Sequence, residues 1–185
     1  MKWKIIIFVV LAQLAVMEVA AQRWSVKSNL MSDALLVPSL GTEFTVAPRW
    51  TFSVDMAWMP ARVASQHFLR TLKLEPELHY WFRAPFTGPF IGPSLSYRPY
   101  NMGGLPVFNT HDSRTQGWLI GGGCVAGWHF FLSPRLGLEP SVTLGYAYAD
   151  YKRYAAPRSL EPIRHEYRHY VGPVAACLQL IYMIK

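Results

Sequence analysis

The chain has 185 residues, of which 51% are hydrophobic and 16% are charged, and its formal net charge is +7. This length suits one domain rather than two. Its two cysteines, Cys124 and Cys177, belong to no CxxC or Cys/His spacing, so the sequence indicates no metal site and favours two small apolar fillers over a disulfide.

The N-terminus has the pattern of an export signal. Lys2 and Lys4 precede a largely apolar stretch over residues 5–17, and small residues at positions 19–21 lead to Gln22. This pattern predicts a cleaved signal peptide over residues 1–21 and a mature domain over 22–185. The alternative, a membrane-anchoring helix, would need about 20 apolar residues. After Gln22 no apolar run reaches that length, so a mature protein inside a membrane would have to be a closed barrel.

Alternation of polar and apolar residues dominates the mature part. It is clearest over residues 69–82, where Lys73 and Glu75 fall on one face and Leu74 and Leu78 on the other. A period of two indicates strands with one polar and one apolar face. In chain order the predicted strands are 24–36, 40–47, 50–60, 69–82, 90–100, 116–131, 136–148 and 170–184.

The connections between these strands differ in length at the two ends of the predicted sheet. Short turns contain Pro48, Pro85 and Pro134, whereas longer connections cover residues 60–68, 101–114 and 150–168. Short turns at one end and long loops at the other are typical of outer-membrane barrels. The sequence therefore predicts an all-β fold, an eight-stranded antiparallel up-and-down transmembrane β-barrel.

The polar faces carry charges of both signs. A barrel of eight strands has a lumen just wide enough to be filled by side chains, so we expect these charges to pair inside it as a structural cluster. The aromatic residues near strand ends, Trp81 and Phe86 among them, are expected at the membrane boundary. The predicted lumen cluster consists of Lys27, Glu43, Asp55, Lys73, Glu75, Glu77, Arg98 and Glu139.

Several segments resemble an uncharacterised outer-membrane family of Bacteroides-type bacteria, a domain of unknown function. They are Trp24-Ser-Val-Lys-Ser-Asn-Leu, Pro38-Ser-Leu-Gly-Thr-Glu-Phe, Leu74-Glu-Pro-Glu-Leu-His-Tyr-Trp, Gly117-Trp and Leu144-Gly-Tyr-Ala-Tyr-Ala-Asp-Tyr. The resemblance covers nearly all of residues 24–184 and implies an eight-stranded outer-membrane barrel, in some relatives linked to fimbrial gene clusters. Residues 155–168 lack the Cys- and Lys-rich loop of those relatives, so partner recognition by that loop does not carry over.

No catalytic, cofactor-binding or metal-ligating set stands out. Glu75 and Glu77 match a glycosidase pair in residue type, but a filled lumen would keep a sugar from reaching them. The glycines at 121–123 lack the Lys and Ser/Thr of a phosphate loop. The family implied by the resemblance has no established catalytic residues either, so we expect no enzyme activity and no cofactor.

The last predicted loop is basic. Arg153, Arg158, Arg164 and Arg168 lie in it. If it is extracellular, its nearest anions are lipopolysaccharide phosphates, which suit guanidinium groups; generic surface charge is the alternative.

These features predict an anchoring or surface-interaction protein of the outer membrane. Its expected partners are outer-membrane lipid, lipopolysaccharide and a fimbrial or other surface protein, and an exported chain is not expected to meet nucleic acid. Two alternatives stay open: a lipid-modifying outer-membrane enzyme and a soluble periplasmic lipocalin-like barrel.

Overall fold

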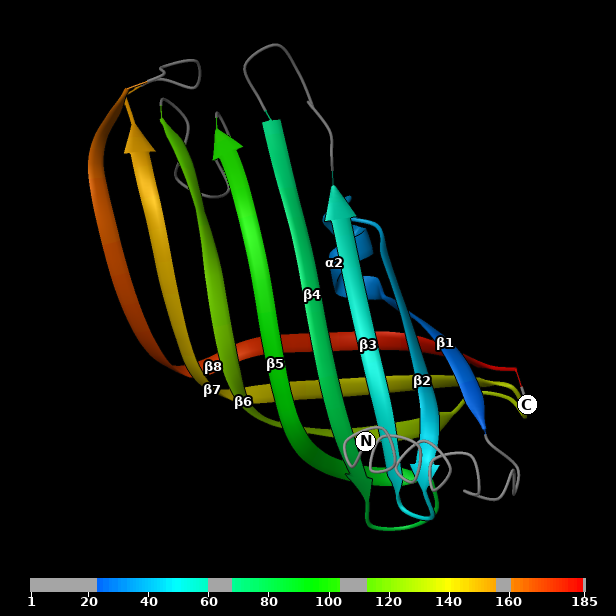
Figure 1. Cartoon of the computed structure of the whole chain (residues 1–185). Helices are drawn as coiled ribbons and strands as arrows, with labels where there is room; N and C mark the ends of the chain where they lie inside the picture. Colours follow the sequence, from blue (N-terminus) through cyan, green and yellow to red (C-terminus); the bar gives the residue numbers. More distant parts are fainter. Residues whose placement is uncertain (1–22, 60–67, 104–112, 156–160, 185) are drawn as a thin grey trace, which may run out of the picture.

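The computed structural model describes residues 23–59, 68–103, 113–155 and 161–184. Each strand pairs antiparallel with its sequence neighbours, and β8 pairs with β1 to close a barrel (Figure 1). The predicted all-β fold with eight antiparallel strands is confirmed; the predicted signal peptide lies outside the described residues. The strands are β1 Trp24–Asn29, β2 Ser39–Ala47, β3 Trp50–Met59, β4 Phe68–Trp81, β5 Gly88–Gly103, β6 Arg114–Phe131, β7 Leu136–Tyr154 and β8 Pro162–Met183.

A short helix, α2 (Leu30–Ala34), replaces the second half of the first predicted strand. The prediction of a strand over residues 24–36 is therefore wrong after Asn29. The Asn29 side chain accepts hydrogen bonds from the backbone N–H groups of Met31 (3.1 Å) and Ser32 (3.4 Å), which caps a helix and competes with further strand pairing. Within the described ranges, no helix is long and apolar enough to cross a membrane.

The last two strands are longer than predicted. β7 continues to Tyr154 and β8 begins at Pro162, so most of the predicted loop 150–168 is a two-stranded ribbon in which Arg153 lies opposite Arg164. The period of two is interrupted in β8. Thr143 pairs with Ala175 and Leu144 pairs with Pro173, so β8 has one extra residue between them and its alternate side chains change faces there. This break concealed the continuing strand pattern.

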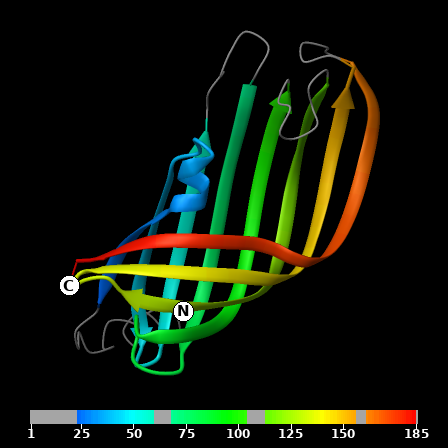
Figure 2. The same cartoon turned by 180° about the vertical axis from the view of Figure 1, so that it is seen from behind.

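β6, β7 and β8 turn sharply near their middles, as Figures 1 and 2 show. Gly123, Gly145 and Gly172 lie opposite one another across the three strands at this level. A Cβ atom on Gly123 would collide with the Leu144 carbonyl, and one on Gly145 would collide with the Gly122 carbonyl. β6 and β7 therefore approach so closely at the bend that side chains do not fit at Gly123 and Gly145.

The seam that closes the barrel is short. It joins Ser25–Asn29 of β1 to Gln179–Met183 of β8, at the end of the barrel that carries the short turns. Before Gln179, the described part of β8 pairs with β7 alone. α2 contacts β8 where β1 has ended, and the longer β5–β8 strands extend beyond this closed part (Figure 2).

Candidate functional site

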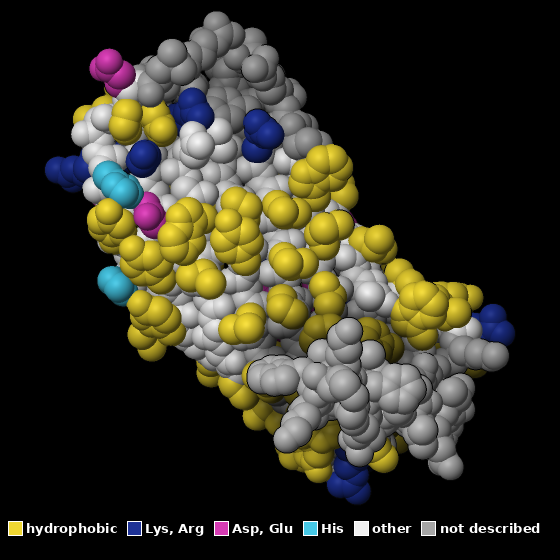
Figure 3. Space-filling model, in the orientation of Figure 1, with side chains coloured by type: hydrophobic (Ala, Val, Ile, Leu, Met, Phe, Trp, Pro, Cys, Tyr) yellow, Lys and Arg dark blue, Asp and Glu magenta, His cyan; other side chains and the backbone are white. Residues whose placement is uncertain are grey.

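The barrel has its polar side chains inside and its apolar side chains outside, which is the reverse of the arrangement in a water-soluble protein. Side chains on the inner face of the closed part are polar or charged and buried, whereas large apolar side chains lie on the outer face, with Leu95 62% exposed. Hydrophobic side chains cover much of the face in Figure 3, and Lys and Arg gather toward its ends. The buried polar set comprises Ser25, Lys27, Asn29, Glu43, Thr51, Ser53, Glu75, Glu77, His79, Ser94, His129, Glu139, Thr143 and Gln179.

A network centred on Glu43 connects β1, β2 and β3. Lys27 Nζ lies 2.9 Å from Glu43 Oε2 and 3.6 Å from Asp55 Oδ2, and the Thr51 hydroxyl donates to Glu43 Oε1. Ser53 in turn donates to Asp55 Oδ2 at 2.9 Å. These residues meet because alternate positions of adjacent antiparallel strands point into the same lumen.

Two buried histidines extend the network across the lumen. His79 has Nδ1 3.0 Å from Glu43 Oε1 and Nε2 3.0 Å from Glu77 Oε2. Opposite, His129 Nδ1 lies 3.2 Å from Glu139 Oε2. The predicted lumen cluster did not include either histidine, although His79 follows Glu75 and Glu77 at the same two-residue interval on β4. Both histidines therefore belong to the same polar interior as the carboxylates.

A second group of charges lies farther from the turns. Lys73 and Glu75 form an ion pair, and Lys73 Nζ also donates to the Cys177 thiol at 3.8 Å. Arg98 Nε is buried and has no hydrogen-bond partner among the described residues. Cys177 and Cys124 are both free thiols. The structure thus places all eight residues of the predicted lumen cluster on the inner face.

An apolar cluster closes the lumen at the turn end. Trp81, Phe86, Phe90 and Val125 pack together and are almost completely buried, and the Trp81 indole N–H donates to Thr51 at 2.8 Å. The expectation that Trp81 and Phe86 lie at the outer boundary is wrong. Trp81 occupies the same inner phase as Glu75, Glu77 and His79, so its ring points into the barrel.

The family described as protein of unknown function (DUF3575) matches residues 5–184, nearly the whole chain. The chain belongs to this DUF3575 family. A comparison with curated proteins found no match.

Glu75 and Glu77, the pair that matches glycosidase carboxylates in residue type, lie inside the DUF3575 lumen. Glu75 and Glu77 share a strand face, but both are buried, and Glu75 is paired with Lys73 while Glu77 lies against His79. A glycosidase needs its two carboxylates on opposite sides of an accessible sugar. Glu75 and Glu77 do not meet this requirement, because they are buried neighbours on one strand face.

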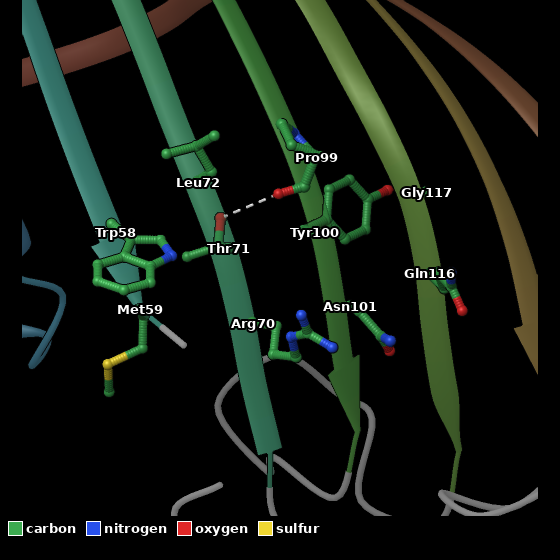
Figure 4. A pocket seen from close by; sticks show the side chains of 10 residues that line it. All are labelled: Trp58, Met59, Arg70, Thr71, Leu72, Pro99, Tyr100, Asn101, Gln116 and Gly117. Atoms are coloured by element: carbon green, nitrogen blue, oxygen red, sulfur yellow. Dashed lines mark hydrogen bonds between the residues drawn. The ribbon is translucent and has the colours of Figure 1, made fainter. Parts of the chain in front are cut away.

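A groove of about 360 Å³ lies over β3, β4, β5 and β6 near the loop end of the DUF3575 barrel (Figure 4). Trp58, Leu72 and Pro99 give it an apolar lining, and the Thr71 hydroxyl donates to the Pro99 carbonyl at 3.4 Å. Arg70 carries the only charge among the described lining residues. The groove therefore offers apolar contact but no pair of groups suited to proton transfer.

The loop end of β7 and β8 carries the predicted anion-contacting residues. Arg153, Arg164 and Arg168 are exposed on these strands rather than in a loop, and Arg158 lies outside the described residues. The Tyr151 hydroxyl donates to Glu166 at 2.7 Å and Arg164 lies 3.3 Å from it, so both hold the pKa of Glu166 below its usual value. The remaining arginines keep this end basic.

Proposed function

We propose that this protein is an outer-membrane β-barrel that acts as a rigid anchor, with a filled lumen and a surface-exposed loop end that contacts anionic partners. The observation that carries the proposal is the reversed polarity of the barrel. Lys27, Glu43 and Glu139 have almost no exposed surface, while Leu95 and Leu144 are exposed on the outside. In water such an outer face would be costly, whereas in lipid it is favourable.

The hydrocarbon region would surround the closed part of the barrel. In lipid every backbone N–H and C=O group needs a protein partner, and only closed strands or helices supply one. The closed seam of β1 and β8, together with α2 beside β8, meets this requirement at the turn end. Among the described residues, β8 before Gln179 has a strand partner on one side only, so this edge does not meet the requirement and the β7–β8 ribbon would project beyond the bilayer.

The projecting ribbon supports the second half of the proposal. Arg153 and Arg164 lie opposite each other, and Arg168 is on the same side of the ribbon. Opposed like charges are unfavourable unless an anion lies beside them, and Glu166, 3.3 Å from Arg164, supplies one negative charge for these three arginines. A further anion would therefore be favourable here. Lipopolysaccharide phosphates are the nearest such anions at an outer surface, and planar guanidinium groups bind phosphate in a bidentate way. A fimbrial or other surface protein is the second partner that we propose for the exposed end of the barrel.

Membrane fractionation with heat-modifiable electrophoresis tests the proposal. We expect the mature chain in the outer-membrane pellet, migrating faster unboiled than boiled because the closed barrel resists dodecyl sulfate. A chain found in the soluble periplasmic fraction would instead support the lipocalin-like alternative. Mass spectrometry of lipid A from cells with and without the gene separates the anchor from a lipid A-modifying enzyme, since the anchor predicts identical lipid A species.

A further inference from the structure

We propose that Glu43, His79 and Glu139 bind a divalent transition cation inside the barrel, with Zn²⁺ the first ion to test. One possible ligand atom from each of the three side chains lies within 4.8 Å of the other two. All three side chains are buried, and they come from β2, β4 and β7, which the barrel brings together across its lumen. This inference goes beyond the anchoring function and does not depend on it.

Contacts within the trio leave room for a cation. His79 Nδ1 is 3.0 Å from Glu43 Oε1, and two tetrahedral ligands at about 2.1 Å from one zinc ion would lie about 3.4 Å apart, so a small movement would admit the ion. Glu139 Oε1 is buried and receives no hydrogen bond from any described residue. A buried carboxylate oxygen without a donor is unfavourable, and a cation between Glu139 and the other two ligands would satisfy it.

The outer atoms of the trio are already held by other groups. Glu43 Oε2 is 2.9 Å from Lys27 Nζ, and Glu139 Oε2 is 3.2 Å from His129 Nδ1. His79 Nε2 lies 3.0 Å from Glu77 Oε2, which would fix the ring, and a metal would replace the present contact between Nδ1 and Glu43 Oε1. Carboxylate–histidine–metal arrangements of this kind orient ligands in known metal sites. The surroundings are therefore those of a built site rather than of a chance acidic cluster.

The charge of the lumen also fits a divalent ion. The inner face carries five carboxylates, and Lys27, Lys73 and Arg98 are its permanent cations. The difference is two negative charges, which equals the charge of one divalent cation in size and is opposite in sign. An imidazole nitrogen with two carboxylate oxygens suits Zn²⁺ better than Mg²⁺, which prefers oxygen ligands alone. The carboxylates at the inner face are Glu43, Asp55, Glu75, Glu77 and Glu139.

Refolding with metal and elemental analysis tests the site. The full mature chain is refolded into detergent micelles with or without ZnCl₂, since a closed barrel would exchange a buried ion slowly, and then passed through a desalting column. We expect about one zinc per folded chain and a higher unfolding temperature than for the metal-free protein. Glu139→Gln and His79→Gln should each lower the apparent zinc affinity at least tenfold. The same experiment with MgCl₂ should give no retained metal.

Two controls separate this site from other zinc binding. Exposed His165 lies 2.5 Å from Asp150, and His169 is also exposed, so every protein in the experiment carries His165→Gln and His169→Gln. Glu75→Gln changes a buried lumen carboxylate outside the trio and should leave the zinc content at one. If a ligand variant fails to fold, the parent protein with Glu43, His79 and Glu139 intact is refolded with Co²⁺ and its absorption spectrum is recorded instead. We expect d–d bands and no thiolate charge-transfer band. Zinc absent from the refolded parent, or retained equally by Glu139→Gln, overturns the proposal.

Discussion

Lys27 and Glu43 form an ion pair at 2.9 Å in which neither side chain has any exposed surface. A charge buried without water is unfavourable on its own, and here the attraction between the two opposite charges offsets the lost hydration of both. The pair connects β1 to β2 beside the short β1–β8 seam. Its integrity is therefore coupled to the closure of the barrel.

Lys27→Met should destabilise the barrel by about 3–5 kcal/mol, because it leaves the Glu43 carboxylate buried without its cation. Lys27→Met combined with Glu43→Gln should recover part of that loss. Urea unfolding in detergent micelles measures both effects. Lys152→Met, which removes an exposed cation from β7, serves as the control and should change stability by less than about 0.5 kcal/mol. Equal stability of Lys27→Met and Lys152→Met would contradict a buried pair.

Trp81→Ala should lower the free energy of unfolding by about 3–5 kcal/mol, because the ring fills the turn end of the lumen against Phe86 and Phe90. The variant also leaves Thr51 without the indole donor. Trp128→Ala removes the same side chain from the exposed outer face and should cost less. The fraction of each variant that migrates as the compact, folded form in unboiled electrophoresis measures the effect of each substitution. If Trp128→Ala were the more damaging, the inward orientation of Trp81 would be wrong.

Gly123→Ala should lower the free energy of unfolding by about 1–3 kcal/mol, because the added methyl group would collide with the Leu144 carbonyl where β6 and β7 bend together. Gly121→Ala is the matched control, since its methyl group would find its nearest atom at an ordinary 3.4 Å. Unfolding midpoints in urea compare the two. A Gly121→Ala variant as damaged as Gly123→Ala would show that backbone freedom, and not close approach, selects glycine here.

Leu95→Arg should destabilise the membrane-inserted protein by about 2–4 kcal/mol, the cost of a basic residue facing the middle of a bilayer. Ile163→Arg places the same charge on an equally exposed aliphatic position, 68% exposed, at the loop end of β8. It should be tolerated, because this position lies beyond the proposed hydrocarbon region. Folding titrations into lipid vesicles measure the difference, and tolerance of both substitutions speaks against the lipid-facing assignment of Leu95.

Alternation in the sequence was enough to identify the eight strands and the inner face of β4. Because side chains alternate between the two faces of a strand, placing one residue determines the face of all the others. Lys73, Glu75 and Glu77 could therefore be placed on one face together. The same rule places His79 and Trp81 inside. Trp81 was misplaced because aromatic residues near strand ends are also typical of membrane boundaries.

The remaining differences arise where local and long-range preferences compete. Asn29 ends β1 through a cap that depends on three residues, although the polar pattern continues past it. β7 and β8 extend into the predicted loop because each supplies the other's hydrogen-bond partners, a pairing that no single segment encodes. The Glu43–His79–Glu139 group joins three strands far apart in sequence, and no spacing motif could reveal it.

In the proposed membrane arrangement, the outer face of the closed barrel meets lipid. Its most direct test attaches an environment-sensitive fluorophore to Leu95→Cys in a Cys124→Ser, Cys177→Ser background, with the protein folded into vesicles. We expect bromine-labelled acyl chains to quench the fluorophore at Leu95→Cys and a water-soluble quencher to leave it unaffected. At Ile163→Cys we expect the water-soluble quencher to act and the bromine-labelled chains to have no effect. Free access of the water-soluble quencher to the Leu95→Cys label would contradict the account.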